Sequence, residues 1–173
     1  MPNSDPHVCA RCHVQGGGCC RLGHPDDQTK MFGLTPGEIA GITEATGLAP
    51  SDFLIHDQAA PDFLAFLDQI HPIFRRLMPG GQRRRLRVDA TGRCHFLGPA
   101  GCRLPRDARP LYCRLYPIWF TPDDRLMVLI SAHCLAQTDA RSWREVLARL
   151  GHDEAHFREL FAQLSQLAGS DPA

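Results

Sequence analysis

Residues 94–117 read C-H-F-L-G-P-A-G-C-R-L-P-R-D-A-R-P-L-Y-C-R-L-Y-P and place Cys94, Cys102 and Cys113 in a segment that glycine and proline interrupt repeatedly. Such interruptions predict loops, where cysteines contribute little to a hydrophobic core. A loop can bend several thiolates toward one point, as a metal site requires. We therefore expect this segment to carry metal ligands.

Five further cysteines bring the total to eight; they are Cys9, Cys12, Cys19, Cys20 and Cys134. Adjacent residues point their side chains apart, so Cys19 and Cys20 are expected to serve different metal centres or different metals of one polynuclear cluster. Eight thiols make two sets of four, the number that two zinc ions or one or two iron–sulfur clusters need. Soft thiolates favour these metals over magnesium or calcium. The sequence therefore predicts that all eight are ligands of an iron–sulfur cluster or Zn²⁺.

The composition predicts one ordinary domain spanning residues 1–173, of which 43% are hydrophobic. Because 19 basic residues balance 19 acidic ones, nothing favours a nucleic acid or a membrane as partner. No secretory signal or membrane-spanning segment is recognisable, which predicts a cytoplasmic protein. In a reducing cytoplasm, eight cysteines favour metal binding or redox chemistry, whereas an exported chain would favour disulfides.

Helical patterns fill much of the chain outside the cysteine segments. Capping boxes at Thr35–Glu38 and Ser142–Glu145 predict two helix starts. Gly47 and Gly151 are the expected ends of these helices. Apolar spacing predicts a short helix from residue 51, a helix over 61–78 broken near Pro72, and a helix over 153–167. Residues 5–23, which include three consecutive glycines, are predicted to form a loop.

Two segments have the alternation typical of β-hairpins. In the first, Leu86 and Val88 precede a turn at 90–92 that leads into Cys94; in the second, 118–120 and 126–130 flank a turn at 121–124. Together these patterns predict an α+β fold, a small single domain in which helices pack around short β-hairpins and a loop-rich metal site.

Two other groups of charged or titratable residues bear on the site. Arginines 83, 84, 85 and 87, with 75 and 76 nearby, form the most basic patch, which we interpret as a solvated strand face because no aromatic residues accompany it. Five arginines close to cysteines would stabilise thiolate charge, unless their proximity is accidental; they are Arg11, Arg21, Arg93, Arg103 and Arg114.

Five histidines also lie near cysteines and could each replace a sulfur ligand: His7, His13, His24, His95 and His133. Eight cysteines already complete the ligand count, so we expect ordinary surface or core histidines. His95 and His133, each directly beside a cysteine, are the two to test.

A set of short motifs extends from Cys9 to Cys134. They are Cys9-x2-Cys12, Cys19-Cys20-Arg21, Leu34-Thr35-Pro36-Gly37-Glu38, Cys94-x-Phe96-Leu97, Cys102, Arg109-Pro110-x2-Cys113-Arg114-x-Tyr116-Pro117 and Cys134. In combination they resemble the YkgJ-type cysteine-cluster family, whose CxxCxxCC domain is expected to chelate zinc or iron. The resemblance implies metal chelation, and it supplies no reaction.

Three functions are compatible with these features. The first is a metal-binding protein in which the metal orders the surrounding loops. The second is a redox or methyl-transfer-related enzyme that uses the cluster catalytically, although no G-x-G-x-x-G, P-loop or catalytic triad is present. The third is a metal or redox sensor, or a metal carrier, whose cysteines exchange with a protein partner.

Overall fold

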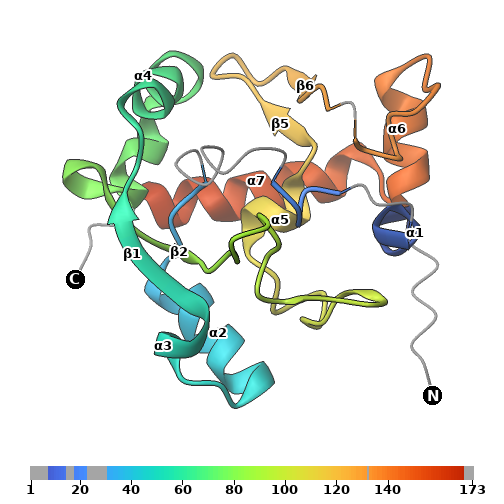
Figure 1. Cartoon of the computed structure of the whole chain (residues 1–173). Coiled ribbons are helices and arrows are strands. Elements are labelled where there is room, and N and C mark those ends of the chain that lie inside the picture. The colour runs from blue at the N-terminus through green and yellow to red at the C-terminus, as the bar shows by residue number, and fades with distance from the viewer. Residues whose placement is uncertain (1–7, 15–17, 23–30, 132, 170–173) are drawn as a thin grey trace.

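The computed structural model describes residues 8–14, 18–22, 31–131 and 133–169, which form an α+β arrangement of helices and small antiparallel sheets (Figure 1). The helices are α1 (Val8–Val14), α2 (Pro36–Thr46), α3 (Pro50–Phe53), α4 (Pro61–Ile70), α5 (Leu111–Leu115), α6 (Trp143–Leu150) and α7 (Glu154–Gly169), with 3-10 segments η2 (Pro72–Leu77) and η3 (Pro79–Gly81). The antiparallel strand pairs are β1 (Leu54–Gln58) with β2 (Gln82–Leu86), β3 (Leu97–Gly98) with β4 (Gly101–Cys102), and β5 (Ile118–Phe120) with β6 (Leu126–Val128).

Helix α7 runs behind the centre of the molecule and supports the elements that lead to the cysteines (Figure 1). It packs against α5, η2 and β5, and its buried face carries Phe157, Leu160 and Leu164, as the predicted amphipathic pattern requires. A separate hydrophobic cluster brings α2, α3 and β1 together around Phe53 and Phe96, whose ring centroids are 5.6 Å apart. The cysteine-rich segments therefore rest on two hydrophobic clusters. Among the described residues, no helix is both long and apolar enough to cross a membrane.

The capping box of α2 is confirmed. The Thr35 hydroxyl accepts a hydrogen bond from the Glu38 backbone N–H at 3.2 Å, and the Glu38 carboxylate accepts one from the Thr35 N–H at 2.8 Å. The box at α6 is only half correct: Ser142 caps the helix, but the Glu145 carboxylate accepts from the N–H of Arg141 instead of Ser142. Both helices end at the predicted glycines.

Other local predictions are also confirmed. The helix predicted over 61–78 is interrupted before Pro72, where α4 gives way to η2, because proline cannot donate the helical hydrogen bond. The second predicted hairpin is the pair β5 and β6.

The first predicted hairpin forms, but it is short, and the longest pairing of this region is a different one. Strand β2 pairs over five residues with β1, from Leu54 opposite Leu86 to Gln58 opposite Gln82. Leu54, which the short helix predicted from residue 51 was expected to include, instead begins strand β1. The predicted hairpin itself consists of the antiparallel bridge between Val88 and Cys94, flanked by backbone hydrogen bonds from Asp89 N–H to the Arg93 carbonyl and from His95 N–H to the Arg87 carbonyl, both at 2.9 Å.

The predicted solvated strand face is wrong for Arg83 and Arg85, whereas Arg76 and Arg87 of the same patch are exposed. Arg83 and Arg85 are 4% and 3% exposed, and both guanidinium groups converge on Asp57 of β1. The Arg83 Nε lies 2.8 Å from Asp57 Oδ1, and the Arg85 Nε lies 2.7 Å from Oδ2. Because burial of two positive charges requires a compensating negative charge, this part of the basic patch is structural.

The predicted N-terminal loop contains a helix. Val8 and Cys12 on α1 are buried at 3% and 7% exposure, and Val8 belongs to the same hydrophobic cluster as α6 and α7. A seven-residue helix is too short to be stable alone, so this tertiary contact stabilises α1 where the local sequence gives little helical signal.

Candidate metal centre

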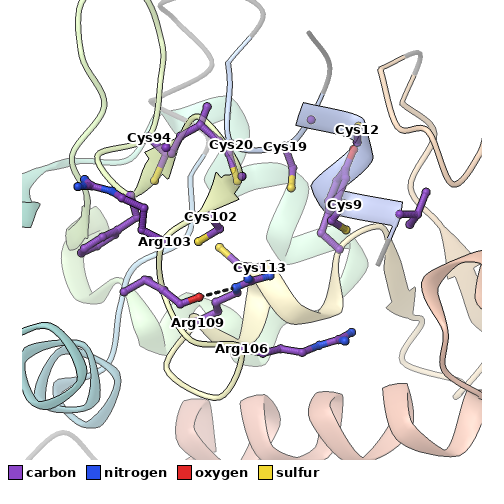
Figure 2. Close-up of a pocket in the computed structure, with 18 of the residues that line it drawn as sticks. Cys9, Cys12, Cys19, Cys20, Cys94, Cys102, Arg103, Arg106, Arg109 and Cys113 are labelled. Atoms are coloured by element: carbon purple, nitrogen blue, oxygen red, sulfur yellow. Dashed lines mark hydrogen bonds between the residues drawn. The ribbon is translucent and has the colours of Figure 1, made fainter. Parts of the chain in front are cut away.

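All eight cysteines line a single cavity of about 670 Å³ (Figure 2). All eight are thiols. They come from α1, from residues 18–22, from the segment around β3 and β4, from α5, and from the loop that begins at residue 133. The fold thus brings together every cysteine that the sequence singled out, although several lie on helices or strands instead of in loops.

Helix α1 contributes two sulfurs to the cavity. Cys9 and Cys12 are three residues apart, a spacing that places side chains on the same helix face. The Cys12 Sγ donates a hydrogen bond to the backbone carbonyl of His133 at 3.3 Å. Because His133 directly precedes Cys134, this contact holds the helix beside the last cysteine of the chain.

The segment 18–22 is held against the central cysteine segment by backbone pairing. The Cys94 N–H donates to the Cys20 carbonyl at 2.9 Å, and the Leu22 N–H donates to the Gly92 carbonyl at 2.9 Å. Gly92 has a φ of +76°, and a Cβ at this position would lie 2.9 Å from the Leu22 carbonyl oxygen. The close approach of the two segments therefore requires glycine.

Strand β4 and helix α5 place Cys102 and Cys113. Cys102 ends β4 opposite Leu97 of β3, and the Arg103 N–H extends the pairing to the Phe96 carbonyl at 2.8 Å. Cys113 lies in the middle of α5. In Figure 2 the sulfurs of Cys102 and Cys113 point toward each other.

Burial favours the neutral thiol at Cys9, Cys94, Cys102 and Cys113. It is the largest cause that raises the pKa of Cys9 from 9.0 to about 11 and that of Cys94 to about 12. Cys9 is an exposed residue, yet its side chain lines the cavity, where burial acts on the thiol. Burial, followed by the thiolate charges of Cys20 and Cys94, raises the pKa of Cys113 well above its ordinary value.

Cys19 and Cys20 do not point fully apart as predicted. A hydrogen bond with the Cys19 side chain, followed by burial, raises the pKa of Cys20. Cys19 also approaches Tyr116: burial is the main cause that raises the pKa of this phenol, and the charges of Cys19, Cys134 and Cys12 add to it. Cys19 therefore adjoins both its neighbour and the cysteines of α1.

Two arginines of the cavity wall oppose the effect of burial. The charge of Arg109 lowers the pKa of Cys9, Cys20 and Cys102, although burial or hydrogen bonding outweighs it in each case. Arg103 acts in the same way on Cys94 and Cys102.

Of the five arginines predicted beside the site, only Arg103 lines the cavity within the described chain. The sequence prediction missed Arg109, whose Nε donates to the Leu104 carbonyl at 3.1 Å (Figure 2). Its signal was present in the motif Arg109-Pro110-x2-Cys113.

The described residues do not yet form a closed coordination sphere. Within them, no group of three or more histidine, cysteine, aspartate or glutamate side chains is placed so that it could hold a metal ion. The sulfurs share a cavity, and ligation requires them to move closer together. The donor set of this cavity fits a soft metal, because its described lining contains eight thiols and no carboxylate or imidazole.

The histidines predicted for testing lie outside the cavity lining. The His95 ring packs edge-on against Phe96 with centroids 4.9 Å apart. Burial and the charges of Arg103 and Arg87 lower its pKa. His133 is exposed and contributes its carbonyl to Cys12. His7 and His24 lie outside the described residues, as does the side chain of His13.

No model of a known protein family matches this chain, and no curated protein or solved structure matches it either. The resemblance to YkgJ-type proteins therefore stays a prediction from the motifs.

Proposed function

We propose that this chain is a metal-binding protein whose clustered cysteine thiolates hold an iron–sulfur cluster or zinc. The observation that carries the proposal is the cavity lined by eight thiols that the sequence scatters between residues 9 and 134. Clustering of this kind has no evident benefit for a hydrophobic core. It supplies soft ligands in the numbers that these metals use.

The electrostatics of the cavity support a cationic occupant. Burial raises the pKa of Cys9, Cys94 and Cys113, so these thiols resist ionisation unless a positive charge enters. A bound metal ion supplies that charge, and each thiol loses its proton as it becomes a ligand. Arg103 and Arg109 offset part of the negative charge of the resulting thiolate site.

The choice between the two metals depends on Cys19 and Cys20. Adjacent cysteines rarely fit one tetrahedral ion without strain, whereas a polynuclear centre offers them different metal atoms. We favour iron–sulfur on this ground. Such a cluster would supply electron transfer, while zinc would order the segments that line the cavity.

The test is an ultraviolet–visible spectrum with metal and acid-labile sulfide analysis of protein purified without air. Broad absorption that dithionite bleaches, together with iron and sulfide, would identify a cluster. Colourless protein with stoichiometric zinc would identify a zinc site. Protein with neither metal, and no uptake of either after reconstitution, would refute the proposal.

A pair of variants separates ligation from general effects on the cavity. Cys113→Ala removes a thiol and is expected to reduce metal content and the melting temperature. Ala100→Ser adds a hydroxyl to an exposed part of the same cavity wall and is expected to change neither. Unchanged metal content in Cys113→Ala would remove this residue from the ligand set.

A further inference from the structure

The eight thiols of the cavity divide into two sets by their positions in the fold. We define the inner set as Cys20, Cys94, Cys102 and Cys113, and the outer set as Cys9, Cys12, Cys19 and Cys134. Resting on the metal-binding function above, we propose that each set forms its own four-sulfur metal site, and that the outer site exchanges its metal more readily.

The inner set is connected through the backbone and one hydrophobic cluster. Cys20 and Cys94 share the 2.9 Å backbone hydrogen bond. Cys94 and Cys102 both pack against the cluster around Phe53 and Phe96, and so does Tyr112, the neighbour of Cys113. Figure 2 shows these four sulfurs on the same side of the cavity.

The outer set gathers around α1. Cys9 and Cys12 share one face of this helix, and the Cys12 Sγ contacts the carbonyl of the residue before Cys134 at 3.3 Å. Gly18, which precedes Cys19, also adjoins this sulfur: a Cβ built on Gly18 would lie 3.9 Å from the Cys12 Sγ. Three segments separated in sequence thus bring the four outer cysteines to one end of the cavity.

Three of the eight cysteines contact hydrophobic clusters, and the contacts differ between the sets. Cys134 packs against the large cluster that includes Val8, Leu115 and Trp119, whereas Cys94 and Cys102 pack against the cluster of α2, α3 and β1. The adjacent pair Cys19 and Cys20 is the junction between the sets. A division at this point gives each neighbouring sulfur its own site and avoids the strain of placing both on one tetrahedral ion.

Exposure differs between the sets and predicts which metal leaves first. All four inner cysteines are half-buried. In the outer set Cys12 is buried and the Cys9 side chain lines the cavity, but Cys19 is exposed. A competing thiol or chelator can therefore reach that site from solvent through Cys19. The inner site is expected to maintain the fold, and the outer site to pass metal to or from a thiol-bearing partner.

The test loads the metal-free full-length chain with Zn²⁺ without air and counts bound zinc by native mass spectrometry. The wild-type chain is expected to bind two equivalents and to release them to a chelator at two distinct rates. Cys102→Ser and Cys134→Ser form a matched pair, because both residues are half-buried. Each variant is expected to lose one equivalent, Cys102→Ser the slowly released one and Cys134→Ser the rapidly released one.

Two results would overturn the division while leaving the proposed function intact: one zinc equivalent in the wild-type chain, or loss of all zinc in both folded variants. Absence of zinc, iron and sulfide from every preparation would instead refute metal binding itself. If a variant fails to fold, ¹¹³Cd nuclear magnetic resonance of the Cd²⁺-loaded wild-type chain decides the question. Two cadmium signals of equal intensity support two sites, and a single signal contradicts them.

Discussion

The backbone N–H of Leu111 donates a 2.8 Å hydrogen bond to the Glu38 Oε1, although the two residues lie 73 positions apart. The other carboxylate oxygen of Glu38 completes the capping box with Thr35. One side chain thus fixes the starts of α2 and α5, and α5 carries Cys113. This contact gives a physical reason for two distant motifs of the sequence, Thr35-Pro36-Gly37-Glu38 and Arg109-Pro110-x2-Cys113, to occur in one chain.

Replacement of Glu38 is therefore expected to affect the cavity as well as α2. Glu38→Ala should lower the free energy of unfolding by about 1–2 kcal/mol, since the helix cap and the acceptor of the Leu111 N–H are lost together. Metal content should also fall. Glu44→Ala, at an exposed position of the same helix, is the control. Urea denaturation and metal analysis check both variants. If Glu38→Ala and Glu44→Ala had the same stability and the same metal content, the contact of Glu38 with Leu111 would contribute little.

Gly92 offers a test of the backbone pairing that positions Cys20. Gly92→Ala introduces strain at a φ of +76° and a Cβ 2.9 Å from the Leu22 carbonyl oxygen. We expect a loss of about 2–3 kcal/mol in stability, with reduced metal content. Gly47→Ala also sits at positive φ, +70°, but in open space, so it should cost about 1 kcal/mol and leave metal content unchanged. If both variants lost metal equally, the clash with Leu22 would not be the cause.

Asp57 is expected to be the most sensitive charged residue of the sheet. Asp57→Ala leaves the fully buried Arg83 side chain without its carboxylate and should cost about 3 kcal/mol in unfolding free energy. The exposed pair of Asp68 and Arg75, 3.5 Å apart, is the comparison. Asp68→Ala should cost less than about 1 kcal/mol. Chemical denaturation measures the unfolding free energy of both variants. Similar losses in Asp57→Ala and Asp68→Ala would contradict a structural role for the buried arginines.

Arg109 is expected to tune thiol reactivity. Because its charge lowers the pKa of Cys9 against the larger effect of burial, Arg109→Gln should raise that pKa further. Alkylation of Cys9 in the metal-free protein should then be slower at a given pH, which peptide mass spectrometry can follow. Arg125→Gln, which removes an exposed partner of Asp123, is the control. An unchanged alkylation rate of Cys9 in Arg109→Gln would show that the charge of Arg109 does not control the pKa of this thiol.

The metal-free protein should lose stability as the pH rises from about 9 to about 12. Burial is the main cause that raises the folded-state pKa of Cys9 to about 11 and of Cys94 to about 12, so the unfolded chain ionises first, near the ordinary value of 9.0. Stability from a raised pKa is complete below the unfolded value and disappears as pH rises through the folded value. Denaturant titrations across this range measure the slope. A variant with serine at positions 9 and 94 should lose less stability per pH unit over this range. If its stability falls as steeply as that of the wild-type chain, these two thiols are not the cause.

Local signals in the sequence predicted local structure. The capping box at Thr35 and the hairpin of β5 and β6 depend on residues within a few positions of one another, so their patterns are readable. The pairing of β1 with β2 and the formation of α1 depend on distant partners. The turn after Val88 correctly predicted a short local hairpin, but it gave no sign of the longer pairing of β2 with β1.

The candidate site shows the same limit. The cysteines were evident from their number and spacing, and the structure brings all eight to one cavity. The sequence motif contains Arg109, but only the fold shows that its charge acts on Cys9, one hundred residues earlier. Nor did the sequence indicate that Arg83 and Arg85 are buried, since only the strand register places Asp57 opposite them.

The contact between Cys12 and the carbonyl of His133 joins residues that are 121 positions apart. During synthesis the first cysteines leave the ribosome well before the residues that complete their surroundings, by roughly 6 to 24 s at common elongation rates. Over that interval Cys9 and Cys12 are accessible thiols without the rest of the cavity. The metal binding that we propose would therefore have its full ligand set only after Cys134 has left the ribosome.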